Sequence, residues 1–221
     1  MNLDNCLAAR RSVRGFLPDK SVPVEVLEDI FSRAQAAPSN CNVQPWRVFV
    51  AWHEQCHLLR TNLLAAFDGG DFGSPEDAVD AFVGDYRTLQ IECAQALYSE
   101  MGIARGDKAG RLRAHRRNFE FFEAPHVLIV CMDKNFGLGV ALDVGMYIQT
   151  LMLLLKSRDI DSCAQASLRM YPDIVRQTLD IDDNLRIMCA ISFGYEDKGI
   201  AANKTQQRRR PWQDNVVWQQ P

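Results

Sequence analysis

The sequence predicts one domain of the α/β or α+β class, in which helices alternate with about four short strands. The chain has 221 residues, 47% of them hydrophobic and 24% charged, which is typical of a globular domain large enough to bury a core. Short apolar runs of strand length are separated by longer segments with a helical period. Because we find no internal repeat and no long linker, a single domain over residues 1–221 is expected.

A Rossmann fold is not predicted. The strands are too few relative to the helices, and no GxGxxG motif follows any of them. The chain also has no GxxxxGK[ST] loop. Any bound nucleotide must therefore be held by residues outside these two motifs.

The first long helix is expected to begin at Pro23, after Ser21, and to end before Pro38. Its apolar residues recur with a helical period and are Val24, Leu27, Ile30, Phe31 and Ala34. A short strand over 47–52 follows, and a helix over roughly 53–67 comes next. Both are read from the pattern of apolar residues.

The middle of the chain is expected to form a surface excursion over about 68–122. It begins with turn residues over 68–75 and continues with a long helix over roughly 76–101. The stretch 105–117 is basic and polar, and 118–123 is rich in aromatic residues.

In the second half, the apolar run 127–132 is typical of a buried strand, and 140–155 predicts a strongly apolar helix. That helix is shorter than the ~20 residues needed to cross a bilayer, and Asp143 and Gln149 interrupt it. It should therefore be buried on nearly all sides, either by its own core or by a partner chain. Further strands are expected over 160–164 and 187–193.

A helix is expected over 172–179, between the last two strands, and the end of the chain is polar and rich in arginine.

The net charge of −3 and the pI near 5.8 argue against nucleic acid or an anionic membrane as partner. The seven cysteines form no CxxC pair, which indicates reduced thiols and a cytoplasmic location. No signal-peptide core precedes Arg10. His53 and His57 have no third ligand nearby, so no metal site is expected.

The first candidate site is the arginine block over 10–14. It places Arg10, Arg11, Ser12 and Arg14 within five residues. The planar guanidinium group donates two parallel hydrogen bonds, which suits a phosphate. In an extended segment, Arg10, Ser12 and Arg14 would lie on one side, with Arg11 and Val13 on the other. A solvated basic patch is the alternative interpretation.

The second candidate site is the amide loop over 38–44, which contains Pro38, Ser39, Asn40, Cys41, Asn42 and Gln44. Side-chain amides both donate and accept hydrogen bonds, so Asn42 and Gln44 suit the edge of a flavin or pterin ring. The alternative is that these residues only build turns. The sequence indicates no histidine that pairs with Cys41, so we expect a small, unreactive side chain rather than a nucleophile.

The arginines 208–210 form a third basic cluster. They are few for a nucleic-acid patch in an acidic chain. We favour a role for one of them at the same phosphate as Arg10 and Ser12.

These motifs resemble the FMN-dependent nitroreductase family over almost the whole chain. Six motifs fall in the family's order, namely 10–14, 38–46, 143–149, 162–165, 192–195 and the tail around Arg209 and Pro211. The stretch from 117 to 125 is similar to the subgroup that reduces nitrobenzoates and other nitroaromatics.

The resemblance implies an α+β fold with a central, mostly antiparallel sheet flanked by helices. It also implies an interwoven homodimer with a swapped C-terminal tail and two FMN sites at the interface. The residues implied to bind FMN are Arg10, Arg11, Ser12, Arg14, Pro38, Ser39, Asn40, Asn42, Gln44, Gln165, Ala166, Ser167 and Arg209. Asn40 and Cys41, with the excursion over 101–122, would shape the substrate pocket.

Individual roles follow from the same resemblance. Arg10, Ser12 and Arg209 would hold the phosphate and ribityl chain, and Arg14 would face the N1/O2 edge of the flavin. Asn42 and Gln44 would line the ring from the opposing subunit. The backbone over 165–167 would contact N5 and O4.

The implied reaction is a ping-pong cycle, in which NAD(P)H passes a hydride to flavin N5 and a nitroaromatic or quinone then takes it from the same face. A cation at Arg14 would stabilise charge that develops on the reduced ring. No side-chain acid or base is required, so no dedicated catalytic residue is expected. The alternatives are a quinone or flavin reductase, a reductive dehalogenase, and a flavin-binding protein without turnover.

Three positions depart from the family pattern. Ala166 stands where many relatives carry an acidic residue, and Gln206 and Gln207 occupy tail positions that are often basic. Phosphate affinity is then expected to depend more heavily on Arg10 and Arg209.

Overall fold

The computed structural model of the protein describes residues 1–71, 73–77 and 81–219. The predicted turn over 68–75 includes Phe72, and the predicted helix over 76–101 includes residues 78–80. These positions, and residues 220–221 of the predicted domain, lie outside the described residues.

The centre of the fold is a four-stranded sheet with the order β1-β2-β4-β3. The strands are β1 (Arg47–Trp52), β2 (His126–Asp133), β3 (Asp161–Gln165) and β4 (Leu185–Gly194). All three pairings are antiparallel, which confirms the expected α+β class with a mostly antiparallel sheet. Because β2 and β4 are the inner strands, the buried apolar run predicted over 127–132 lies at the middle of the sheet.

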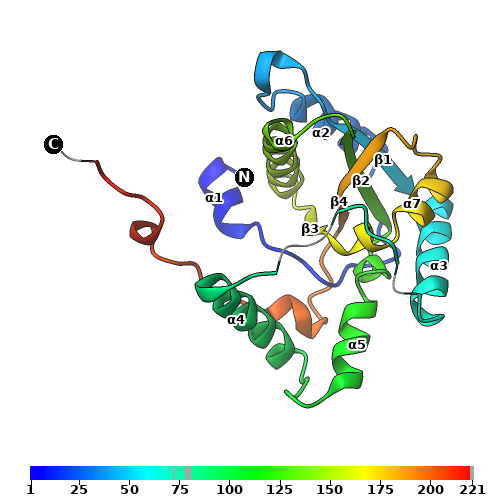
Figure 1. Cartoon of the computed structure of the whole chain (residues 1–221), viewed down its shortest axis with the longest axis vertical. Helices are drawn as coiled ribbons and strands as arrows, with labels where there is room; N and C mark the ends of the chain where they lie inside the picture. The colour runs from blue at the N-terminus through cyan, green and yellow to red at the C-terminus, as the bar shows by residue number, and fades with distance from the viewer. Residues whose placement is uncertain (72, 78–80, 220–221) are drawn as a thin grey trace.

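Alternate residues of β2 serve two separate cores, one on each face of the sheet. Leu128 and Val130 pack with α2 (Val24–Ala34) and α6 (Leu138–Ser157). Val127 and Ile129 pack on the other side, where α3 (Glu54–Asp68) and α7 (Pro172–Leu179) lie. Figure 1 shows these helices on opposite faces of the sheet. The alternation follows from the two-residue period of a strand.

The predicted helix over 140–155 is present as α6, but its expected burial on nearly all sides is not found within one chain. Tyr147, Leu151 and Leu155 are buried against the sheet, whereas Leu138 and Leu142 are 82% and 65% exposed. By length and composition alone α6 would also pass as a membrane span. Its contacts with the sheet are those of a core helix, and its exposed side is left uncovered by the residues that the structure describes.

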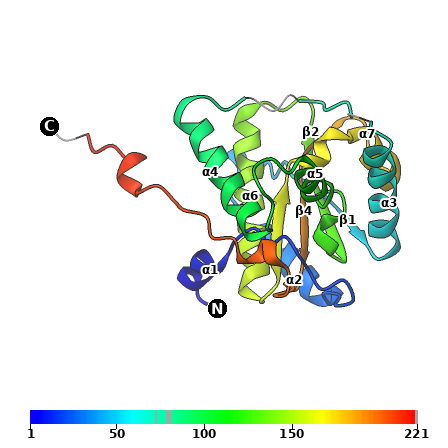
Figure 2. The same cartoon turned by 90° about the horizontal axis from the view of Figure 1, so that it is seen from below.

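Helix α1 (Leu3–Ala9) lies beside α6 and adds exposed Leu3 and Leu7 to the same side of the molecule. The C-terminal tail, residues 206–219, runs away from the body of the protein in both views (Figures 1 and 2). It carries the short helix η5 (Trp212–Asp214) and exposed Val217 and Trp218.

Two expectations for the excursion were wrong. Helix α4 begins only at Gly84 (Gly84–Glu100), because Glu76 and Asp77 are held outside it by ion pairs to Arg176 and Arg169. The basic stretch, expected without an element, forms α5 (Lys108–Arg116), which is capped by the Asp107 carboxylate.

The aromatic end of the excursion is also not on the surface. Phe119, Phe121 and Phe122 are buried in the core on the α3 and α7 side, since three large apolar rings gain more from burial than from exposure. Residues 121–123, which form η2 (Phe121–Glu123), all have positive φ angles. Periodicity gives no signal for such a left-handed turn.

Candidate functional site

The arginine block lies along the outer edge of β3. Ser12 bridges Ser162 in a parallel arrangement, and the Val13 amide donates to the Ser162 carbonyl at 3.1 Å. Val13 is fully buried, as the extended alternation predicts. Arg11 donates to the Glu196 carboxylate at 2.5 Å. Arg11 therefore fixes the block to the chain after β4.

Asn203 fixes the other end of the block. Its side-chain oxygen accepts from the Arg14 amide at 2.6 Å, and its nitrogen donates to the Gly15 and Asp197 carbonyls at 2.8 and 2.9 Å. A Cβ at Gly15 would lie 2.6 Å from the Ile200 side chain, so only glycine fits there. The block is therefore a rigid segment rather than a solvated patch.

Arg10 and Arg14 are both half-buried, and neither forms an ion pair in the described part of the chain. The Arg14 guanidinium donates only to the Ser12 carbonyl, at 3.4 Å. Ser12 and Arg14 also lie close enough to Cys163 to oppose the rise that burial causes in the pKa of that thiol. Two partly desolvated cations without a carboxylate partner make a site suited to an external anion.

The turn after β3 lies in sequence next to this cationic site. Gln165 is buried and its side chain points inward, where it is bonded to Ser192 and to the Asn118 carbonyl. Ala166 is exposed, and η3 (Ser167–Met170) begins just after it. The Ser167 hydroxyl is buried without a hydrogen-bond partner among the described residues. A buried hydroxyl without a partner is uncommon and leaves one donor and acceptor of this turn unused.

The amide loop is held in an unusual backbone conformation. Cys41, Asn42 and Gln44 have φ angles of 51°, 56° and 47°, a region that side chains other than glycine seldom adopt. Asp143 on α6 accepts from the Asn40 amide at 3.1 Å, and the Ser39 hydroxyl accepts from the Gln44 amide at 3.0 Å. The loop is therefore a preformed surface.

The side chains of the amide loop are only partly free. Gln44 donates from its side chain to the Asn42 carbonyl at 3.0 Å, so one of its donors serves the loop itself. Pro38, Asn40, Cys41 and Asn42 are exposed. Gln44 therefore helps to build the turn, as the alternative interpretation predicts. The exposed side chains of the loop do not have this role and can contact a ligand.

One chain does not bring the block and the loop together. The loop is attached at Asp143 near the start of α6, and the block is attached to β3, which follows the end of α6 at Ser157. At 1.5 Å per residue these two points of α6 are about 21 Å apart. In the described residues no hydrogen bond joins the two segments.

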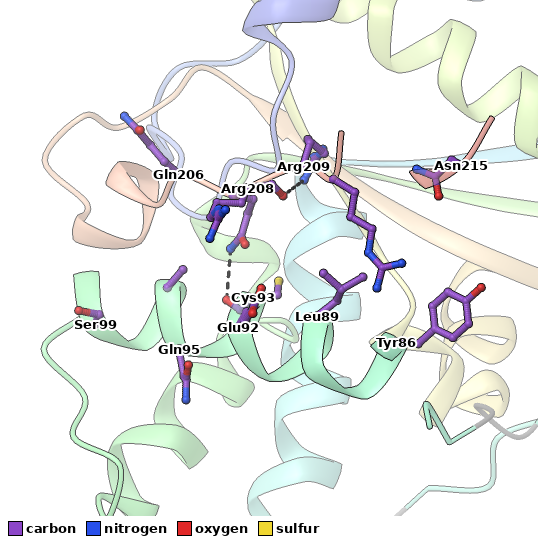
Figure 3. Close-up of a pocket in the computed structure, with 13 residues that line it drawn as sticks. Tyr86, Leu89, Glu92, Cys93, Gln95, Ser99, Gln206, Arg208, Arg209 and Asn215 are labelled. Carbon is purple, nitrogen blue, oxygen red and sulfur yellow. Dashed lines mark hydrogen bonds between the residues drawn. The ribbon is translucent and has the colours of Figure 1, made fainter. Parts of the chain in front are cut away.

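Arg209 lies apart from the block as well. A groove of about 870 Å³ separates α4 from the tail, and Figure 3 shows Arg208 and Arg209 above Cys93 and Leu89. Gln207 fastens the tail by donating to the Cys93 carbonyl at 3.2 Å. Within the described chain, Arg209 forms no hydrogen bond or ion pair with Arg10 or Ser12; it donates to the Arg208 carbonyl at 3.4 Å.

Two anchoring residues were missed as site residues. Asp143 carried a signal, because a carboxylate in an otherwise apolar helix needs a polar partner when it is buried. Asn203 carried none, since nothing near it in sequence points to Gly15 or Arg14.

All seven cysteines are unpaired, and burial raises the pKa of Cys56 to about 11 and that of Cys131 to about 12. These buried thiols are not nucleophiles at neutral pH.

The fold and the site define an α+β protein with a preformed, half-buried cationic site at a sheet edge. The model of the Nitroreductase family matches residues 7–195. The chain belongs to this family, which confirms the resemblance seen in the motifs and identifies the protein as an oxidoreductase.

Named relatives agree with this assignment. The chain is 33% identical over 208 residues to 4-nitrobenzoate reductase of Pseudomonas putida, covering 94% of this chain and 91% of the relative. Among solved structures, the FMN and NADPH-dependent nitroreductase NfnB from Sphigopyxis sp. strain HMH matches with a TM-score of 0.96 and 31% identity over all of both chains. FMN-dependent NfnB from Mycobacterium smegmatis, in complex with NADPH, matches with a TM-score of 0.93 and 32% identity over 98% of this chain and 97% of that one.

Proposed function

We propose that the protein is an NAD(P)H-dependent FMN flavoprotein that reduces nitroaromatic compounds. The observation that carries the proposal is the pair of half-buried, unpaired guanidiniums of Arg10 and Arg14, next to a turn with an unsatisfied Ser167 hydroxyl. The names of the relatives support the choice of ligands, because one is a 4-nitrobenzoate reductase and another is an FMN and NADPH-dependent nitroreductase.

The residues present fit FMN. Arg10 and Ser12 would hold the phosphate and ribityl end, with Arg209 brought in from a tail, and Arg14 would supply a positive charge to the ring. The backbone over 165–167 would donate hydrogen bonds to the ring. Arg11 acts differently, because Glu196 already engages its guanidinium; its role is to keep the block in place.

Bound FMN would supply hydride acceptance and donation between NAD(P)H and the nitro group. The chain's own part is to bind and orient. Arg14 provides a fixed positive charge where negative charge develops on reduction. No side-chain acid or base is assigned, and protons for the acceptor come from water. Asn40 and Cys41, exposed on a preformed loop, form one wall of the acceptor pocket.

The active unit in this proposal is a homodimer. The neighbouring helices α1 and α6 both carry exposed leucines, which a second chain could cover. The amide loop is anchored near the start of α6 and the block lies on β3, beyond the end of α6, so in this proposal one flavin meets a block and a loop from different chains. A tail that crosses to the partner would bury Trp218 and Val217. The reduced cysteines fit a cytoplasmic location.

The test begins with the purified protein. A flavoprotein should be yellow, with absorbance near ~450 nm, and anaerobic NAD(P)H should bleach it within seconds to minutes. A panel of nitroaromatics, quinones and halogenated aromatics, assayed with NADH and NADPH, then identifies the acceptor class and the preferred donor. A colourless protein that cannot be reconstituted with FMN would overturn the proposal. A yellow protein that neither nicotinamide bleaches would indicate flavin binding without turnover.

A further inference from the structure

The Gln165 side chain forms a buried bridge between the sheet and the excursion. It lies at the C-terminal end of β3 and is only 3% exposed. The Ser192 hydroxyl donates to Gln165 Oε1, and Gln165 Nε2 donates to the Asn118 carbonyl at 2.8 Å. A buried amide bonded at both ends is costly to misplace, because each lost bond leaves a buried group without a partner.

The two ends of the bridge are firmly held. Ser192 is fully buried in β4, opposite Cys163 in the strand register. Asn118 precedes the left-handed turn at 121–123, which Arg60 clamps by donating to the Glu120 carbonyl at 3.1 Å and the Ala124 carbonyl at 2.7 Å. The bridge therefore joins two rigid supports rather than a support and a loose loop.

The backbone that leaves Gln165 is the candidate ligand turn. Ala166 is exposed and the Ser167 hydroxyl is unsatisfied, so neither of these two side chains holds the backbone at its own position. Buried side chains flank them, Leu168 in η3 and Gln165 in β3, and of these two Gln165 is the one held by hydrogen bonds. Donors that stabilise developing charge act well only when they are fixed before the charge appears.

We propose that Gln165 is a positioning residue. Through its bonds to Ser192 and to Asn118, it fixes the main-chain donors of Ala166 and Ser167 that face flavin N5 and O4, without touching the flavin itself. This inference rests on the proposed function, because it assumes FMN at the site. It differs from the role suggested by sequence, in which Gln165 is itself a cofactor contact.

The experiment compares Gln165→Leu, which removes both bonds, with Ser192→Ala, which removes one. Thr178→Val is the matched control: it deletes a side-chain hydrogen bond of 3.0 Å, to Asn62, between α3 and α7. For each holoprotein, the flavin midpoint potential, the dissociation constant for oxidised FMN and the midpoint of thermal unfolding are measured, together with the rate of anaerobic bleaching.

We expect Gln165→Leu to lower the bleaching rate at least tenfold and to weaken binding of reduced relative to oxidised FMN about tenfold. For a two-electron couple that ratio corresponds to a shift of about 30 mV. Ser192→Ala should change both quantities in the same direction by less. Thr178→Val should leave both unchanged even where its thermal stability falls.

A Gln165→Leu holoprotein with the wild-type potential and bleaching rate would overturn the inference. An equal potential shift in Thr178→Val would do the same, because it would show a general effect of destabilisation. If Gln165→Leu does not fold, Ser192→Ala decides the question, and a wild-type potential there counts against the inference. A wild-type protein that binds no FMN overturns the proposed function instead, so the two failures are distinguishable.

Discussion

The arginine block and the C-terminal tail each carry an arginine that is predicted to bind the FMN phosphate, namely Arg10 and Arg209. The block is fixed to the body of the fold, whereas the tail projects from it. Arg10 and Arg14 flank a segment fixed to β3, to Glu196 and to Asn203. Arg209 lies on an exposed tail that projects from the body and is fastened to α4 by a Gln207 bond (Figure 2). In the proposed site, one half is therefore preformed within a single chain, whereas the other half would depend on a partner chain.

Disrupting the assembly should have the largest effect. Leu142→Lys places a charge on the exposed apolar side of α6, where a partner would have to bury it at a cost of several kcal/mol. We expect a monomer in sedimentation experiments that binds FMN at least a hundredfold more weakly, because the amide loop of the partner is lost. Leu58→Lys on α3, on the other face of the sheet, is the control and should stay dimeric. A Leu142→Lys dimer with full FMN content would show that this side is not the interface.

Loosening the arginine block over 10–14, the preassembled half of the proposed site, should have the second largest effect. Asn203→Ala removes three hydrogen bonds and leaves the Arg14 amide without its partner, whereas the Gly15 carbonyl still accepts from the Asp197 amide at 3.0 Å. At about 1 kcal/mol for each lost bond, we expect a loss of about 3 kcal/mol in the free energy of unfolding. Chemical denaturation of the apoprotein measures this loss without FMN. If Asn203→Ala unfolds like the wild type, the block is not fixed in the way the contacts indicate.

The two halves also differ in how far the sequence could predict them. The strand over 47–52 and the helix beginning near Pro23 were placed well, because both depend on local periodicity and on proline chemistry. The left-handed turn at 121–123 was not foreseen, since its φ angles are imposed by Arg60 and by burial of its phenylalanines. Local signals fail where contacts distant in sequence decide the backbone.

The same limit explains which candidate site residues the sequence could predict. Arg10, Ser12 and Arg14 were predicted because charge and spacing are visible in the chain. Asn203 reaches the Arg14 amide across 189 positions, so no pattern near either residue indicates the contact. For Gln165 the sequence predicted a place near the ligand, but the inward direction of its side chain depends on Ser192 and Asn118.

Acid should destabilise the body of the fold, which carries the arginine block. His126 is buried beside Trp52, and its Nε2 accepts from the Val22 amide at 3.2 Å. Burial lowers the pKa of His126 from 6.5 to about 4, with a smaller contribution from His53. Because the unfolded chain binds the proton more tightly, stability is complete above pH 6.5 and falls as the pH drops toward 4.

The expected loss from His126 is on the order of 2–3 kcal/mol between pH 6.5 and 4. Denaturant unfolding at several pH values measures it, and His126→Gln supplies the comparison, because its amide keeps an acceptor for Val22 but does not titrate in this range. A wild-type protein whose stability is flat over this interval, or whose pH dependence is the same in His126→Gln, would rule out this explanation.

The smallest expected effect, and the one that most sharpens the comparison, separates Arg14 from Arg209. If the tail arginine only binds phosphate, Arg209→Ala should weaken FMN binding by about 2 kcal/mol, or roughly thirtyfold, and leave the bleaching rate of the loaded enzyme near that of the wild type. If Arg14 acts on the ring, Arg14→Ala should slow bleaching by NAD(P)H more than it weakens FMN binding, because charge develops there only on reduction. Arg208→Ala, adjacent on the tail, is the matched control for Arg209. Equal losses of binding and bleaching rate in Arg14→Ala and Arg209→Ala would mean that the block arginine and the tail arginine share one role, and that the rigidity of the block serves binding rather than the chemistry of the ring.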